Sequence, residues 1–529
     1  MPNDCVSYQS SGFFTSLITD YLNQNENLKS FYNRFPLLDN FEQQIHEKHA
    51  NFDHTTRAIL VATLLEQYKN CSISEATRTN ILTLKNDQTF TVTTGHQLNI
   101  FTGPLYFIYK ICSTIILTNQ LKLRYPKQHF VPIYWMATED HDFEEIRYFS
   151  FKGKKFNWNK DANGPVGKLD TKGIEDVFRL FSLELGQSDT ANYLKDLFES
   201  SYLKHNNLSE ATRYLANALF SKYGLVILDA EVPELKSAFI PFVKKEILEQ
   251  FSFQKVSETI AQLKPYTIQV HPRPLNLFYL SDHFRERIIY EDGIYKVNNT
   301  DLTFTTNAIL NELETHPEQF SPNVLLRPLY QEVILPNLTY IGGGGELAYW
   351  LELKAMFNSV NITFPMLLLR NSVLLATQKQ AAKADKLGLN WHDLFEKQAQ
   401  LLTHQTQKVS KTQLDFSALK VQLNHQFKTL YDLSNKTDAS FLGALKAQEA
   451  KQMKGIENLE KRMLKAQKKV HEEHLKRVKE LQNQLFPLQG LQERQDNFSS
   501  FYVEFGPILL SQLMEELQPL AHEFKVLVF

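Results

Sequence analysis

Residues 89–104 have the sequence TFTVTTGHQLNIFTGP, and an apolar run follows from residue 105 to about residue 121. Phe90 and Val92 alternate with threonines, which is typical of a β-strand. The glycines that follow indicate a loop, and Pro104 stands where prolines often begin a helix. A strand, a glycine-bearing loop and an apolar helix form the first half of a β-α-β unit.

Other short apolar segments follow the same pattern. We expect strands at residues 130–136, at 224–228 before Asp229, at 365–369 before Arg370, and at the closing residues 524–529. Short apolar strands separated by helical stretches favour a mostly parallel, doubly wound sheet. The sequence therefore predicts an α/β fold with a Rossmann-like core.

The regions around this core have different sequence patterns. Residues 287–290 and 294–297 flank a turn at Asp292-Gly293, which predicts an antiparallel hairpin. The predicted organisation is an N-terminal helical region (1–88), a core (89–150, 223–264 and 321–378), a mostly helical first insertion (151–222), a β-rich second insertion (265–320), a coiled-coil helical hairpin (379–490) and a C-terminal return to the core (491–529).

The coiled-coil prediction depends on apolar spacing. Residues Ile456, Leu459, Met463, Ala466 and Val470 are separated by three and four positions, as in a coiled-coil seam. A second stripe over residues 416–430 would be the antiparallel partner across a turn at 434–438. The hairpin would cover part of the seam, and we expect the rest to pack against a second copy in a homodimer.

Composition excludes several classes. The chain has 529 residues, 43% of them hydrophobic, and a formal net charge of −2, so nucleic acid is not an expected partner. Three cysteines form no C-x-x-C pair, and no signal peptide or 18-residue apolar span is present. We therefore expect a soluble cytoplasmic protein with no membrane partner.

The first candidate site is the loop after residue 94. Ligands of open α/β sheets bind at the carboxyl ends of the strands, where a helix N-terminus favours anions. Glycines would let the backbone approach a phosphate, and polar side chains would add donors. The alternative is a tight turn with a satisfied histidine. The candidates are Gly95, His96, Gln97, Asn99, Thr102 and Gly103 in the loop and Lys110 on the helix.

The second candidate site is Glu139-Asp140-His141-Asp142, directly after a predicted strand. Three adjacent carboxylates repel one another unless a cation neutralises them. That cation could be Mg²⁺ or an amino-acid ammonium, so a metal site stays open. The alternative is a solvated helix start, where acids complement the helix dipole.

The third candidate site surrounds a run of four glycines before an apolar helix. Such a run is entropically costly and indicates backbone approach to a ligand, although a flexible loop would also explain it. Two arginines at other predicted loop positions are plausible anion ligands. The candidates are Gly342, Gly343, Gly345 and Glu346 with Asn323, Arg327 and Arg370.

Together these motifs resemble one known family. The segments TGHQ (94–97), FTGPLY (101–106), EDHDF (139–143), SPNVLLRP (321–328), GGGGE (342–346) and LQER (491–494) occur in the order found in the bacillithiol-biosynthesis cysteine ligase family, BshC. The resemblance covers nearly the whole chain. It implies a Rossmann-like core with two connective insertions and a coiled coil, as in class I synthetase-like folds. One departure is Gly344, where we expect proline in many members.

The resemblance also implies a reaction, the ligation of cysteine to glucosaminyl-malate through an amide bond. Carboxylate activation suggests ATP or another adenine nucleotide, with Mg²⁺ possible. Gly95, His96, Gly103 and Arg370 would bind phosphates. Asp140 or Asp142 would bind the cysteine ammonium, and Arg327 or Lys110 the malyl carboxylates. His96 or His141 would be the base, so His96, His141 and Asp140 are the catalytic candidates.

Two other functions are compatible with the residues alone. One is a different nucleotide-dependent ligase or a nucleotidyltransferase acting on a small acid. The other is a nucleic-acid-binding or scaffold protein that uses the basic coiled coil. The segment Lys408-Val409-Ser410-Lys411-Thr412 is similar to the lysine loop of class I aminoacyl-tRNA synthetases. It follows the last predicted core strand, and we interpret the similarity as coincidence.

Overall fold

A five-stranded parallel sheet forms the core of the computed structural model, which describes all residues except 412–413 and 437. Its order is β13-β12-β2-β3-β6, built from β13 (Met366–Leu369), β12 (Asn337–Gly342), β2 (Thr89–His96), β3 (His129–Met136) and β6 (Val226–Asp229). All of β2 and nearly all of β3 are buried. Helix α6 (Tyr106–Arg124) connects these two strands. The predicted Rossmann-like α/β core is confirmed.

The strand β12 is a feature that apolar patterning did not predict. It lies in the sheet between β2 and β13, and its last residue, Gly342, is the first of the four glycines considered as a candidate site. Asn337 and Thr339 make the strand partly polar, and both are buried. Asn337 accepts hydrogen bonds from the Thr91 and Thr93 hydroxyls of β2. Threonine and asparagine therefore occupy buried strand positions where apolar residues would be expected.

A second sheet joins the two ends of the chain. Strand β15 (Glu523–Val528) pairs parallel with β14 (Ser372–Ala376) and antiparallel with β1 (Asp4–Ser7). The closing segment is therefore a strand, but it is not part of the five-stranded sheet. The region before β2 is otherwise mainly helical, with α2 (Ser16–Leu22), α3 (Phe41–Asn51), α4 (Thr56–Gln67) and α5 (Glu75–Thr83).

Two further layers lie beside the core. One contains the hairpin of β4 (Tyr148–Phe151) and β5 (Lys154–Asn157) followed by α8 (Glu175–Leu185), α9 (Asp189–Phe198) and α10 (Leu208–Phe220). The other is an antiparallel sheet of order β10-β9-β8-β7-β11, in which β7 is Leu277–Leu280, β10 is Thr303–Phe304 and β11 is Phe320–Pro322. Its hairpin of β8 (Arg285–Glu291) and β9 (Ile294–Val297) turns at Gly293, whose φ of 80° suits glycine.

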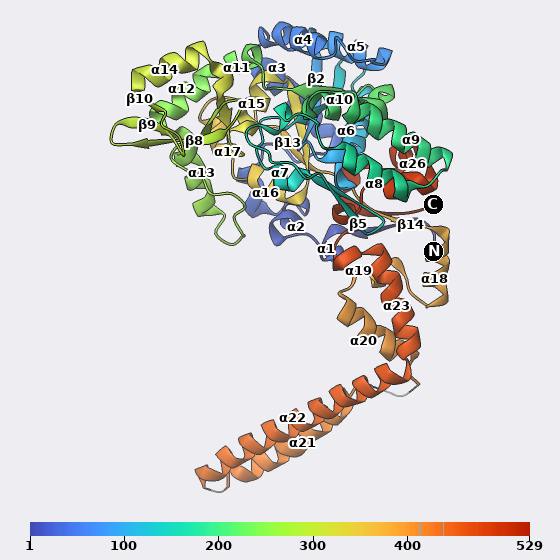
Figure 1. Ribbon diagram of the computed structural model, residues 1–529. Helices are drawn as coiled ribbons and strands as arrows, with labels where there is room; N and C mark the ends of the chain where they lie inside the picture. The colour runs from blue at the N-terminus through green and yellow to red at the C-terminus, as the bar shows by residue number, and fades with distance from the viewer. Residues whose placement is uncertain (412–413, 437) are drawn as a thin grey trace.

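A long helical arm projects away from this body, as Figure 1 shows in orange. Helices α21 (Ser417–Ser434) and α22 (Ala439–Val470) pack side by side through a small apolar cluster around Leu423, Phe427 and Leu445. Position 437 of the predicted turn lies outside the described residues. Helix α23 (Glu472–Leu485) leads back to the body, where Val478, Leu481 and Leu485 are buried.

Candidate functional site

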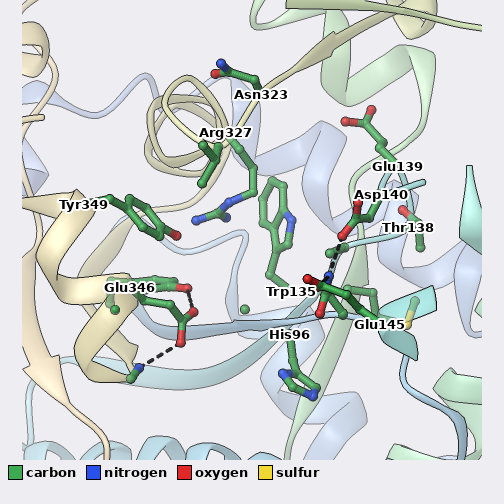
Figure 2. A pocket seen from close by; sticks show the side chains of 18 of the residues that line it. His96, Trp135, Thr138, Glu139, Asp140, Glu145, Asn323, Arg327, Glu346 and Tyr349 are labelled. Atoms are coloured by element: carbon green, nitrogen blue, oxygen red, sulfur yellow. Dashed lines mark hydrogen bonds between the residues drawn. The ribbon is translucent and has the colours of Figure 1, made fainter. Parts of the chain in front are cut away.

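The candidate site is a cavity of about 680 Å³ at the carboxyl edge of the parallel sheet. The ends of β2, β3 and β12 contribute to its lining, as do segments from both neighbouring layers and from the C-terminal region. Figure 2 shows Arg327 and Tyr349 pointing into the space from one side. Glu139, Asp140 and Glu145 lie on the other side. Each side also carries an opposite charge, because Glu346 lies with Arg327 and Tyr349, and Arg285 is close enough to Glu139 and Asp140 to interact with their charges. The cavity is therefore polarised only in part.

Arg370 is the most deeply buried arginine of the cationic side, with 3% of its surface exposed. Its Nη2 donates to Glu493 Oε1 at 2.7 Å, and its Nη1 donates to the Asn371 carbonyl and the Ser372 hydroxyl. Its Nε is buried and has no hydrogen-bond partner. An unpaired buried donor is costly, so this N–H is suited to an anionic ligand.

Arg327 and Arg494 complete the cationic side. The Arg327 guanidinium lies over the rings of Trp135 and Tyr340, each at 5.6 Å, and its Nη2 is buried without a partner. Arg494 lies over the ring of Tyr106 at 5.9 Å. Arginines fixed by aromatic faces present their donors in a defined direction, which favours carboxylate or phosphate ligands.

Lys110 and Glu346 form an ion pair in the wall of the cavity. Lys110 Nζ lies 2.6 Å from Glu346 Oε2 and donates to the Gly95 carbonyl. Glu346 also accepts hydrogen bonds from the Tyr340 hydroxyl and the Gly343 amide. Burial alone would raise the pKa of Glu346, but these three partners together hold it below its ordinary value. The pair ties α6 to the first turn of helix α16 (Gly344–Trp350), which follows β12, and its charges are largely satisfied within the protein.

On the acidic side, most carboxylates have partners too. Glu139 forms an ion pair with the buried Lys236 and accepts a hydrogen bond from the Ser321 hydroxyl. Asp140 accepts one hydrogen bond from the backbone amide of His141 in its own loop and another from Gln97 Nε2 at 2.7 Å. Gln97 Nε2 also donates to Glu145 at 2.8 Å. These bonds hold the ends of β2 and β3 together beside the cavity.

His96 ends strand β2 and is buried between the rings of Tyr106 and Phe107. Its Nε2 has no hydrogen-bond partner. Burial, together with the positive charges of Lys110 and Arg370, holds the pKa of His96 well below its usual 6.5. The imidazole is therefore neutral at physiological pH and is a weak base.

The structure brings most of the predicted site residues to this one cavity. Its lining includes Gly95, His96, Gln97, Lys110, Asp140, Asn323, Arg327, Gly343, Gly345, Glu346 and Arg370. The sequence motifs did not include several other lining residues, namely Trp135, Glu231, Gln269, Arg285 and Tyr349. Glu231 lies three residues after the predicted strand 224–228, and this position could have marked it as a site candidate. No sequence pattern marked the others.

The remaining predicted residues lie outside that lining. Asn99, Thr102 and Gly103 belong to a loop fixed by Asn497, whose side chain donates to the carbonyls of Phe101 and Gly103. Gly103 has φ of 60°, and a Cβ there would meet Asn99 Cβ at 2.5 Å, so its glycine has a structural reason. Gly342 is less crowded, although three side-chain atoms would lie 3.0 Å from a Cβ built there.

His141 and Asp142 line a separate, shallower hollow. Asp142 caps the four-residue helix α7 (Phe143–Ile146) by accepting from the Glu145 amide at 3.3 Å. The lysine motif lies in the arm, where Lys408 donates to the Gly388 carbonyl, and its Thr412 lies outside the described residues. Within residues 1–411, 414–436 and 438–529, no group of three or more His, Cys, Asp or Glu side chains is placed to hold a metal.

Substitution of the two aspartates should separate a site from a helix cap. We expect Asp140→Asn to lower turnover strongly with little change in melting temperature, because Asp140 lines the cavity. Asp142→Asn should leave turnover nearly unchanged, since asparagine is also a good N-cap. Turnover and thermal unfolding of both variants are the measurements. Equal losses of turnover would contradict this division.

The fold and the site define a Rossmann-like α/β protein with a coiled-coil arm and a polarised cavity for small charged ligands. Comparison with known proteins agrees with this class. Residues 1–371 match the family described as "Bacillithiol biosynthesis BshC, N-terminal Rossmann-like domain", and residues 373–529 match its "C-terminal coiled-coil domain". The chain belongs to the bacillithiol biosynthesis BshC family.

Relatives along the full chain carry one name, "Putative cysteine ligase BshC". The protein from Flavobacterium johnsoniae is 60% identical over 527 residues and covers 100% of both chains. That from Flavobacterium psychrophilum is 57% identical, covering 100% of this chain and 99% of its own. That from Cytophaga hutchinsonii is 35% identical, covering 97% of this chain and 96% of its own.

Within the described residues, none of the helices combines the length and apolar character needed to span a bilayer.

Proposed function

We propose that this protein joins L-cysteine to glucosaminyl-malate by an amide bond and so produces bacillithiol. The observation that carries the proposal is the polarised cavity at the carboxyl edge of the sheet. The substrates carry malyl carboxylates and an amino-acid ammonium, and the cavity has donors for the former and acids for the latter. Membership of the BshC family supports the same reaction.

The cationic side suits the anionic groups. Arg327 and Arg370 each have a buried donor without a partner, and the guanidinium groups of Arg370 and Arg494 both lie over the ring of Tyr106. These three would hold the malyl carboxylates and the phosphates of an activating nucleotide, which we propose to be ATP. The nucleotide supplies the free energy for activating the cysteine carboxyl group. Asp140 and its neighbour Glu139 would hold the cysteine ammonium.

The test uses the purified protein with cysteine, glucosaminyl-malate and ATP, with mass spectrometry of the thiol products. We expect bacillithiol, and release of AMP or ADP will distinguish an adenylate from an acyl phosphate. Deletion of the gene should leave glucosaminyl-malate to accumulate without bacillithiol. Unchanged bacillithiol in a deletion strain with no second gene copy would refute the proposal and favour another nucleotide-dependent reaction.

We also propose that the arm forms a homodimer and that the protein acts in the cytoplasm. The three cysteines are unpaired, as expected in a reducing compartment. On helix α22, Leu459 is 59% exposed and Val470 is 71% exposed, although both belong to the predicted seam. Ile456 instead packs against the cluster inside the hairpin. The exposed part of the seam is the surface that a second copy would cover.

For the dimer, Leu459→Asp with Val470→Asp should convert the protein to a monomer, because both changes place charge in the proposed interface. Light scattering should report twice 61.5 kDa for the parent protein and 61.5 kDa for the variant. Gln448→Asp with Gln452→Asp, on exposed positions of the same helix, is the matched control. A parent protein that is monomeric at all concentrations would contradict the proposal.

A further inference from the structure

Glu231 is the cavity carboxylate that the protein's own hydrogen bonds leave least committed. It lies two residues beyond the end of β6, and 6% of its side chain is exposed. Its Oε1 is buried and has no hydrogen-bond partner with good geometry. Its one ion-pair contact is Lys168 Nζ at 3.1 Å, and Lys168 is shared with Asp282 at 3.0 Å.

Its neighbouring acids each accept at least one hydrogen bond from a hydroxyl group. Asp229 accepts from the hydroxyls of Thr138 and Ser209 at 2.6 and 2.7 Å. Glu139 is bonded to Lys236 and Ser321, as described above. Charged and titratable groups surround Glu231 on several elements. The acids are Glu139 after β3, Asp229 at the end of β6, and Asp282, which is paired with Lys168. The other groups are Lys168, Lys236 on α11 (Pro233–Ser237), Arg285 on β8, and Tyr330 on α15 (Arg327–Ile334).

This environment also brings the pKa of Glu231 into the range that suits a general base. Burial and the charges of Glu139 and Asp229 raise the pKa of Glu231 to about 7, against the opposing effect of Lys168. A general base is most effective when its pKa is close to the working pH. His96, in contrast, is held well below this range, and His141 lies outside the main cavity.

We propose that Glu231 is the general base of the ligation, which rests on the function proposed above. The glucosamine ammonium loses a proton to a Glu231 carboxylate oxygen. The free amine then forms a C–N bond with the carbonyl carbon of cysteine, activated by a nucleoside triphosphate as an acyl phosphate or adenylate. The C–O bond to the phosphate breaks, and the phosphate or nucleotide leaves with that electron pair. The second proton of the attacking nitrogen passes to an oxygen of the departing phosphate group, so that a neutral amide remains.

The experiment compares Glu231→Gln and Glu231→Asp with the parent protein from pH 5 to pH 8.5. Glu234→Gln, an exposed acid three residues further on, is the matched control. In the parent, kcat/KM should rise with pH up to about 7. Glu231→Gln should lower kcat/KM on the order of 10²–10⁴-fold and lose this rise. Glu231→Asp should keep the rise and part of the rate.

Thermal unfolding of the same proteins provides a readout that does not depend on activity. Because the folded pKa of Glu231 is raised, the parent loses stability as the pH increases from about 4.5 to about 7. Glu231→Gln removes this loss, so its melting temperature should exceed that of the parent at pH 8 and match it near pH 5. Glu234→Gln should follow the parent throughout.

Three results would overturn the assignment of Glu231. They are full activity in Glu231→Gln, a lowered rate that keeps the parent's rise with pH, and a melting difference that does not change with pH. A different result identifies failure of the underlying function. In that case the parent protein itself yields no bacillithiol from cysteine, glucosaminyl-malate and ATP.

Discussion

Replacing Arg370 with methionine should abolish ligation and lower the free energy of unfolding by about 3–5 kcal/mol, the usual cost of breaking a buried ion pair. Glu493 would be left without its cation in a site where 1% of its side chain is exposed. The cavity would also lose the unpartnered Nε that we assign to an anionic ligand. Denaturant unfolding and steady-state kinetics are the measurements.

A double variant separates the two roles of Arg370. Arg370→Met with Glu493→Gln removes the uncompensated charge, while the glutamine carbonyl oxygen can still accept from the Val373 amide and its NH2 group can donate to the Ser372 hydroxyl. Replacing both members of a buried pair is often close to neutral, so most of the stability should return. Activity should stay lost. A stable double variant with the parent's kcat/KM would mean that Arg370 is only structural.

The parts of the fold that the sequence predicted are those with strong local patterns. The strands β2, β3, β6 and β13 each carry an apolar or alternating run, and the turn before Ile294 has glycine at its tight position. The strands β12 and β14 lack such a contrast with their surroundings. Asn337 in β12 is stabilised by cross-strand hydrogen bonds from the Thr91 and Thr93 hydroxyls of β2, which are tertiary contacts that no local pattern encodes.

The candidate site also has residues that local patterns predicted and residues that only tertiary contacts bring together. Polar loops directly after strands marked His96 and Asp140, because parallel strands end at one edge of the sheet. Arg285 comes from the antiparallel layer and Arg494 from beyond the arm, so only folding brings them to the cavity. The roles of the acids were equally hidden. Asp142 and Glu231 are both acids near strand ends, and only their hydrogen bonds distinguish a helix cap from an uncommitted carboxylate.

Replacing Lys110 with methionine should lower the free energy of unfolding at pH 7 by about 2–4 kcal/mol, somewhat less than a fully buried pair would cost. The expected cost is smaller because Glu346 keeps 27% of its side chain exposed and still accepts hydrogen bonds from the Tyr340 hydroxyl and the Gly343 amide. Lys110 also holds the Gly95 carbonyl, so the wall of the cavity should loosen and turnover should fall. Lys122→Met, at an exposed position of the same helix, should have little effect on either quantity.

The pH dependence of this destabilisation tests its electrostatic origin. In the parent, Glu346 has a lowered pKa, so its stabilising contribution is present above about pH 4.5 and is lost as the pH falls through the folded pKa. Without Lys110, burial dominates and the pKa of Glu346 rises, so the carboxyl group takes up a proton more readily. The free-energy difference between Lys110→Met and the parent should therefore be largest near pH 7 and shrink toward pH 4. A difference that stays constant over this range would show that lost packing of the lysine stem, rather than the buried charge, is responsible.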